Sequence, residues 1–237
     1  MNLPNALTIS RIVAAPLVAL LPLAPTWELR FAAFWLFIAV AITDYWDGKL
    51  ARSRNLVTDL GRLLDPLADK LLLVATFVPM FLLGGTGWEA GFRLGAGTPV
   101  MPGISGPLWA DGGDRMLFPF YTPLGAVMMP WWVFAIILGR EALMTVFRQA
   151  AARRGVVIGA IGPAKLKTVF QWIWVGAGYF WFAAATAAVR FGWSSPLWEG
   201  FALLNGSVAV LSMSIAVLLT LWSMYLYIRR YGSVLRQ

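Results

Sequence analysis

Long apolar runs alternate with short polar stretches along this chain of 237 residues. Each run is close to the ~20 residues that an α-helix needs to cross a bilayer. The pattern predicts an all-α, polytopic membrane protein with six transmembrane helices. These helices are expected at about 8–26, 28–52, 62–84, 126–152, 164–190 and 200–228.

Residues 84–125 interrupt this pattern, because they are rich in Gly and Pro and hold no long apolar run. Such a composition predicts an irregular loop, whose aromatic side chains we expect to rest on the membrane interface. These aromatic residues include Trp88, Trp109, Phe118 and Tyr121. We therefore interpret residues 1–237 as a single membrane domain with one extracytoplasmic loop insertion.

The basic residues divide unevenly between the two sides of the predicted helices. Of the 19 Lys and Arg residues, only Arg30, Arg93, Arg115 and Arg190 fall on the side opposite the termini. Cytoplasmic loops carry the excess of Lys and Arg, so both termini are expected in the cytoplasm, in the inner membrane of a cell. The net charge of +8 is then explained by topology and anionic lipid, and no nucleic-acid partner is expected. The first apolar run is not expected to be a cleaved signal peptide, because no convincing cleavage site follows it.

Cysteine and histidine are both absent from the chain. Their absence excludes disulfides, thiol nucleophiles, thiolate metal sites and any role for imidazole as a base or ligand. Acid–base or metal chemistry in this protein must therefore use carboxylates.

Carboxylates cluster in one short window of this apolar sequence. Asp44 and Asp47 are three residues apart, and Asp65 and Asp69 are four apart, so each pair projects from one face of its helix. The turn between the second and third predicted helices brings both pairs together near the cytoplasmic surface. Four carboxylates in a low dielectric repel one another and need counter-charge.

Divalent cations would supply that charge better than the neighbouring basic side chains. An all-oxygen ligand set favours Mg²⁺ or Mn²⁺, and two such ions form a clamp for phosphoryl transfer. Gly48 and Gly61 would let backbone approach a ligand, and Arg52 is placed to meet phosphate oxygens.

Three other interpretations of the cluster remain open at this point. A structural salt-bridge network would need fewer charges at less regular spacing. A cation transport site would predict matching carboxylates in the second half of the chain, where few acidic residues occur. An intramembrane prenyltransferase would also use Asp-bound Mg²⁺, but with a different acidic spacing.

The residues of this window resemble the signature of the CDP-alcohol phosphotransferase family, D-x2-D-G-x2-A-R-x8-G-x3-D-x3-D. Every fixed position is filled at the correct spacing: Asp44, Asp47, Gly48, Ala51, Arg52, Gly61, Asp65 and Asp69. So many fixed positions make the match specific. Within the family, the chain is most similar to the members that make phosphatidylglycerophosphate. That similarity rests on the N-terminal stretch from Asn2 to Arg11, on Arg140-Glu141 with Arg148, and on Lys165 to Thr168 with Gln171.

The resemblance implies a role for each matched position. Asp44, Asp47, Asp65 and Asp69 would bind two divalent ions, Mg²⁺ or Mn²⁺. The head group of CDP-diacylglycerol would meet Thr8, Gly48, Ala51, Arg52, Thr58 and Gly61. Asp69 would also take the proton from the acceptor hydroxyl, whose oxygen then attacks the phosphorus that bears the diacylglycerol. CMP would leave, and the resemblance further suggests a homodimer.

Basic residues on the fourth and fifth predicted helices indicate the nature of the acceptor. Arg140 and Arg148 share a helix face, and Lys165 and Lys167 begin the next helix. Such a pocket suits an acceptor that already carries a phosphate, such as glycerol 3-phosphate. Serine carries no phosphate and would not require this set, whereas inositol phosphate is harder to exclude. Positive charge that merely fixes topology is the competing explanation.

Overall fold

The computed structural model describes residues 3–53, 59–84, 108–110, 115–156, 158–159 and 162–232. This part of the chain is dominated by six long α-helices, with a short 3-10 helix, η1 (Leu21–Leu23), after the first. The helices are α1 (Leu3–Leu20), α2 (Trp27–Ser53), α3 (Asp59–Gly84), α4 (Trp131–Arg153), α5 (Gly162–Phe191) and α6 (Pro196–Tyr231). The prediction that the fold is mainly helical is confirmed for this part of the chain, which also contains four short strands.

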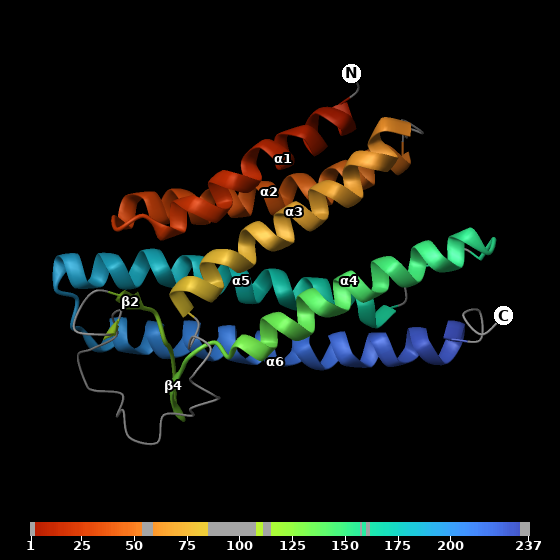
Figure 1. Ribbon diagram of the computed structural model, residues 1–237. Coiled ribbons are helices and arrows are strands. Elements are labelled where there is room, and N and C mark those ends of the chain that lie inside the picture. The colour runs from red at the N-terminus through yellow and green to blue at the C-terminus, as the bar shows by residue number, and fades with distance from the viewer. Residues whose placement is uncertain are drawn as a thin grey trace.

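The helices lie roughly along one direction and bring distant parts of the sequence side by side (Figure 1). α5 packs along α6 and α2, whereas α1 packs against α3 and α2, and α4 contacts α6 and α3. The beginning of α1, the end of α2, the beginning of α3, the end of α4 and the beginning of α5 all lie toward the same end of the molecule in this view. The residues predicted to do chemistry are therefore gathered at one end.

Four of the helical segments are long and apolar enough to cross a bilayer. They are Asn5–Leu23, Leu64–Gly84, Gly162–Phe191 and Pro196–Tyr231. By contrast, α2 carries Glu28, Arg30 and Asp44, and α4 carries Arg140, Glu141 and Arg148. Both helices bring charged side chains to the site described below. That α2 and α4 also span the membrane stays a prediction.

Aromatic side chains fill the space between the helices. Phe77 on α3 packs edge-on against Phe134 of α4, with ring centroids 5.8 Å apart, and contacts Trp174 of α5 at 5.4 Å. All three side chains are buried. Such ring pairs add to the large apolar area that each ring removes from contact with water or lipid. This core fixes α3, α4 and α5 relative to one another beneath the site.

The segment expected to be an irregular loop is more regular where the structure describes it. β1 (Leu108–Ala110) pairs antiparallel with β2 (Arg115–Leu117), and β3 (Phe120–Thr122) pairs antiparallel with β4 (Gly125–Val127). Gly125 has φ 122° at the β3–β4 turn, a conformation that favours glycine. Because β4 occupies residues 125–127, α4 begins at Trp131 and not near residue 126 as predicted.

The aromatic residues of this segment correct a second expectation. Phe118 and Phe120 are fully buried, and Tyr121 is 4% exposed, so they belong to the core and do not rest on an interface. Burial raises the pKa of the Tyr121 hydroxyl to about 12. The backbone N–H groups of Phe118 and Met129 donate to the carbonyl oxygens of Leu83 and Gly84 at the end of α3. These two hydrogen bonds hold the backbone at Phe118 and at Met129 against the end of α3. Trp88 lies outside the described residues, and of Trp109 only the position in β1 is described.

Candidate active site

A row of buried polar residues follows one face of α1. Asn5, Thr8 and Arg11 are each separated by three residues, and each is buried. This spacing places them on the same side of the helix, which packs against α3. The hydroxyl of Thr8 donates a hydrogen bond of 2.7 Å to Oδ1 of Asp65 on α3. The predicted contact residue Thr8 thus lies beside the carboxylates.

Arg11 lies at the centre of the carboxylate cluster. Its guanidinium forms an ion pair with Asp44 of α2. It also lies 3.1 Å from Oδ1 of Asp69 and 3.9 Å from Oδ1 of Asp65, both on α3. The Arg11 side chain is 2% exposed, whereas the three carboxylates are 37–64% exposed. One buried cation therefore joins acidic groups from two helices.

The sequence placed Arg11 among the cytoplasmic charges and in the N-terminal stretch that resembles the family, but its contact with the carboxylates was not predicted. A signal for it was available, because it follows Thr8 by three residues and is the only charged residue of α1. A single charge within an apolar helix is usually functional or paired.

The convergence of Asp44, Asp65 and Asp69 on one cationic group also tests whether they suit a metal. Their oxygens already surround a positive charge, and an all-oxygen set is the kind that Mg²⁺ and Mn²⁺ prefer. The chemistry of these donors fits the expected ions, but among the described residues no three acidic side chains are grouped closely enough to hold a metal ion as they lie. The fourth predicted ligand, Asp47, is described only as a position on α2.

The other residues predicted to contact the CDP-diacylglycerol head group are described less completely. Gly48, Ala51 and Arg52 are described as positions in the last turns of α2, as Asp47 is. Gly61 lies buried in the first turn of α3. Thr58 lies outside the described residues.

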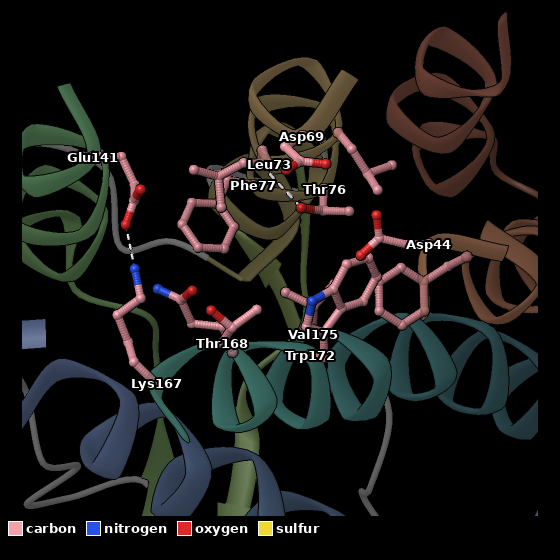
Figure 2. Close-up of a pocket in the computed structure, with 13 residues that line it drawn as sticks. Asp44, Asp69, Leu73, Thr76, Phe77, Glu141, Lys167, Thr168, Trp172 and Val175 are labelled. Atoms are coloured by element: carbon pink, nitrogen blue, oxygen red, sulfur yellow. Dashed lines mark hydrogen bonds and ion pairs between the residues drawn. The ribbon is translucent and has the colours of Figure 1, made fainter. Parts of the chain in front are cut away.

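A cavity of about 200 Å³ connects this cluster with the basic residues of α5. Figure 2 shows Asp44 and Asp69 on one side of it and the Glu141–Lys167 pair on the other. The lining residues come from α2, α3, α4 and α5. They are Phe37, Asp44, Asp69, Leu72, Leu73, Thr76, Phe77, Glu141, Lys167, Thr168, Gln171, Trp172 and Val175.

Of the predicted basic set, Lys167 lines this cavity, and Arg140 does not line it but shares the carboxylate of Glu141 with Lys167. The ammonium of Lys167 donates to Oε1 of Glu141, and Nη1 of Arg140 donates to the same oxygen at 2.8 Å. Arg140 is held further by Ser223 of α6, whose hydroxyl accepts from its Nη2 at 3.2 Å. Lys167 is 4% and Arg140 5% exposed. Glu141 thus pairs with two buried cations, a role that the sequence did not predict for it.

The other two predicted basic residues lie apart from the cavity. Arg148 donates to the hydroxyl of Tyr227 at 3.4 Å and lies over its ring, with its Cζ 5.8 Å from the ring centroid. Tyr227 in turn donates to the carbonyl oxygen of Gly159. Lys165 is exposed on the first turn of α5 and does not line the cavity. The structure therefore brings two of the four basic residues together.

A larger cavity of about 670 Å³ runs between α2 and α5 and shares Asp44, Phe37 and Trp172 with the first. Almost all of its other lining residues are apolar. They are Phe34, Ile38, Ala41, Val169, Ile173, Gly176, Ala177, Phe180 and Val208. The smaller cavity, which has charged residues on its walls, thus continues at Asp44 into one that is lined almost entirely by apolar residues.

Comparison with known families gives a match over most of the chain. Residues 1–95 and 115–226 match the family described as CDP-alcohol phosphatidyltransferase. The unmatched residues between these two regions fall within the predicted loop insertion. All of the carboxylates and basic residues discussed above lie in the matched regions.

Individual relatives are similar at moderate identity. A protein of Mycobacterium tuberculosis named as a probable phosphatidylglycerophosphate synthase is 31% identical over 74% of this chain and 64% of its own length. A CDP-diacylglycerol–glycerol-3-phosphate 3-phosphatidyltransferase of Bacillus subtilis is 30% identical over 74% of this chain and 75% of its own. A CMP-forming cardiolipin synthase of Streptomyces coelicolor is 26% identical over 84% of this chain and 75% of its own. The chain thus spans less than two thirds of the mycobacterial relative.

Proposed function

The chain belongs to the CDP-alcohol phosphatidyltransferase family, and we propose that it transfers a phosphatidyl group from CDP-diacylglycerol to glycerol 3-phosphate, with release of CMP. The observation that carries this proposal is the cavity between Asp69 and Lys167. Asp69 and Lys167 line opposite walls of one small space, which suits a carboxylate base facing a cation that binds phosphate. Family membership argues against the cation transporter and the prenyltransferase considered above.

The carboxylates would hold the two divalent ions that the resemblance implies. Asp44, Asp65 and Asp69 converge on the cationic group of Arg11, and Asp47 would complete the set. Bound there, Mg²⁺ or Mn²⁺ would stabilise negative charge that develops on the phosphate oxygens. Arg11 lies within the same cluster, so its guanidinium is close to where the donor diphosphate would bind.

In the proposed reaction, Asp69 accepts the proton of the acceptor hydroxyl. The oxygen freed of its proton forms a bond to the phosphorus that carries the diacylglycerol. The bond between this phosphorus and the oxygen that bridges to CMP breaks, and CMP leaves with that oxygen. Asp69 is suited to this role because its carboxylate lines the cavity and is 64% exposed, so an acceptor can reach it. Holding both reactants in one cavity supplies much of the rate enhancement.

Lys167 and Arg140 would bind the phosphate of the acceptor. Both are buried and share Glu141 as their carboxylate partner, which keeps two cations together in a low dielectric. An incoming phosphate would take up hydrogen bonds that these cations now direct at Glu141. Ligand sites in proteins commonly have volumes of roughly 300–1,000 Å³, so a cavity of about 200 Å³ favours a small acceptor over inositol phosphate. Arg148 and Lys165 would lie farther from the phosphate of the bound acceptor.

The larger cavity suits the acyl chains of the donor. It is lined almost entirely by apolar side chains and meets the smaller cavity at Asp44. A lipid substrate requires such a continuous path, because its tails stay in the bilayer and its nucleotide stays in water. We further propose that the active end faces the cytoplasm, with both termini there, and that the protein is a homodimer in the inner membrane. The positive-inside distribution of Lys and Arg supports this orientation.

An acceptor panel tests this function directly. Purified protein supplied with CDP-diacylglycerol and Mg²⁺ or Mn²⁺ is expected to release CMP only when glycerol 3-phosphate is added. Asp69→Asn is expected to lower turnover by about 100-fold or more, because the base is lost. Glu199→Gln makes the same chemical change outside the cavity, in the first turn of α6, and is expected to keep normal turnover.

The outcome with other acceptors decides between the alternatives. If CMP release requires serine, inositol phosphate or phosphatidylglycerol in place of glycerol 3-phosphate, the proposed acceptor is wrong. If none of these acceptors supports release, the proposed activity itself is wrong.

A further inference from the structure

Gln171 is a buried polar residue that lines the smaller cavity, and the proposed reaction gives it no role. Its side chain is 6% exposed, and its Nε2 has no hydrogen-bond partner in the described part of the protein. Leaving a buried amide donor unpaired costs about 1–3 kcal/mol. Such a group calls for an explanation, and a ligand that binds in the cavity would supply the missing partner.

The position of Gln171 indicates which partner this is. It follows Lys167 by one helical turn on α5, so the two side chains share a face, and both line the same cavity. The other described side chains with an unpaired buried nitrogen, on Arg140, Trp174 and Trp198 among others, do not line it. Gln171 is therefore placed to meet a ligand that Lys167 also touches.

The chemistry of the Gln171 side chain limits the kinds of ligand group that it can bind. An amide is neutral, so it contributes much less than Lys167 or Arg140 to binding a charged phosphate. It both donates and accepts hydrogen bonds, as a hydroxyl does. An acceptor held by its phosphate at Lys167 and by its reacting hydroxyl at Asp69 presents its middle portion between them. In glycerol 3-phosphate, that portion carries the secondary hydroxyl.

We propose that Gln171 binds the secondary hydroxyl of the acceptor, and so selects glycerol 3-phosphate over three-carbon phosphates that lack this group. The inference rests on the proposed function and adds a residue that determines specificity. A site built to hydrogen-bond a substrate hydroxyl rejects the analogue without it, because the protein group is then left unpaired.

The test compares two acceptors that differ only in this hydroxyl. Glycerol 3-phosphate and 3-hydroxypropyl phosphate share the primary hydroxyl and the phosphate. The unchanged enzyme is expected to prefer glycerol 3-phosphate by about 10- to 100-fold in kcat/KM. Gln171→Met keeps the length of the side chain and removes its polar atoms, so the preference is expected to fall to within about threefold of equality. The KM for CDP-diacylglycerol should stay unchanged.

Two further variants complete the experiment. Gln149→Met makes the same substitution at an exposed position of α4 outside the cavity, and should keep the full preference. Gln171→Asn keeps an amide on a shorter side chain, so the preference for glycerol 3-phosphate should be partly lost. This variant replaces Gln171→Met in the test if Gln171→Met does not fold. An unchanged ratio between the two acceptors in the Gln171 variants would overturn the inference while leaving the proposed function intact. Failure of the unchanged enzyme to use glycerol 3-phosphate at all would overturn both.

Discussion

At the scale of single residues, Arg11 shows how one side chain joins three helices. Its guanidinium contacts Asp44 on α2 and both Asp65 and Asp69 on α3, while its stem belongs to α1. Without a cation, these carboxylates would repel one another in a partly buried site. Arg11 therefore supplies counter-charge that stabilises the cluster when divalent ions are absent.

Replacing this cation should destabilise the metal-free protein more than the metal-bound protein. Arg11→Met is expected to lower stability in EDTA by about 1–3 kcal/mol, because the partly exposed carboxylates lose their shared partner. The melting temperature should fall by several degrees, and Mg²⁺ or Mn²⁺ should raise it more than in the unchanged protein. Thermal unfolding in detergent measures both effects. Arg11→Lys keeps the charge and serves as the control. Equal melting temperatures of the unchanged protein and Arg11→Met in EDTA would contradict this role.

At the scale of elements, the β3–β4 ribbon shows the limit of local sequence patterns. Gly and Pro in this region correctly predict turns, but they do not reveal that Phe118 and Phe120 are buried between helices. Arg30, in the first turn of α2, is also buried. Its Cζ lies 4.6 Å from the ring centroid of Phe118, and its Nε donates a hydrogen bond to the carbonyl oxygen of Pro22. The ribbon and the ends of the helices form one packed layer. Contacts between residues so far apart in sequence are decided by packing and not by composition.

Close approach between α6 and this ribbon depends on Gly206. A Cβ at this position would lie 1.9 Å from the carbonyl oxygen of Tyr121, which is backbone and cannot move aside easily. Gly206→Ala is therefore expected to destabilise the protein by roughly 1–3 kcal/mol, through overpacking.

Gly200 offers a matched control on the same helix. A Cβ there meets nothing within 4 Å, so Gly200→Ala should be neutral or stabilising by up to about 1 kcal/mol, since alanine favours a helix. The melting temperature should thus fall for Gly206→Ala and stay the same or rise for Gly200→Ala. A Gly206→Ala protein as stable as the original would mean that β3 does not pack on α6 in this way.

At the scale of the whole molecule, charge and chemistry gather at one end of the helices. The N-terminal end of α1, the C-terminal end of α4 and the N-terminal end of α5 all lie toward that end in Figure 1. The connection between α5 and α6 lies at the other end. The distribution of Lys and Arg predicts that the first of these ends is cytoplasmic.

The natural absence of cysteine makes this orientation easy to test. Ser194→Cys lies in the connection between α5 and α6, and Arg153→Cys lies in the last turn of α4; both positions are exposed. A membrane-impermeant maleimide is expected to label the first in sealed cells whose inner membrane is intact. The second should react only after the membrane is disrupted. The reverse labelling pattern would invert the proposed topology.

The sequence by itself determined the helices and the chemical type of the site. Apolar runs of sufficient length predicted each helix, because a bilayer crossing requires internal backbone hydrogen bonding over a set length. The fixed spacing of Asp44, Asp65 and Asp69, with no His or Cys in the chain, indicated carboxylate chemistry. The sequence also marked Lys167 and Arg140 as basic residues that suit a phosphate.

Only the tertiary structure decided which of these residues meet. It brought Arg11 among the carboxylates, paired Lys167 and Arg140 through Glu141, and placed Arg148 against Tyr227. It also left the amide nitrogen of Gln171, in the cavity, without a hydrogen-bond partner among the described residues. Helical periodicity assigns a residue to a face, but how α1, α3 and α5 turn those faces toward one another depends on packing between distant segments. That packing, through Phe77, Phe134 and Trp174, is what converts separate polar positions into one site.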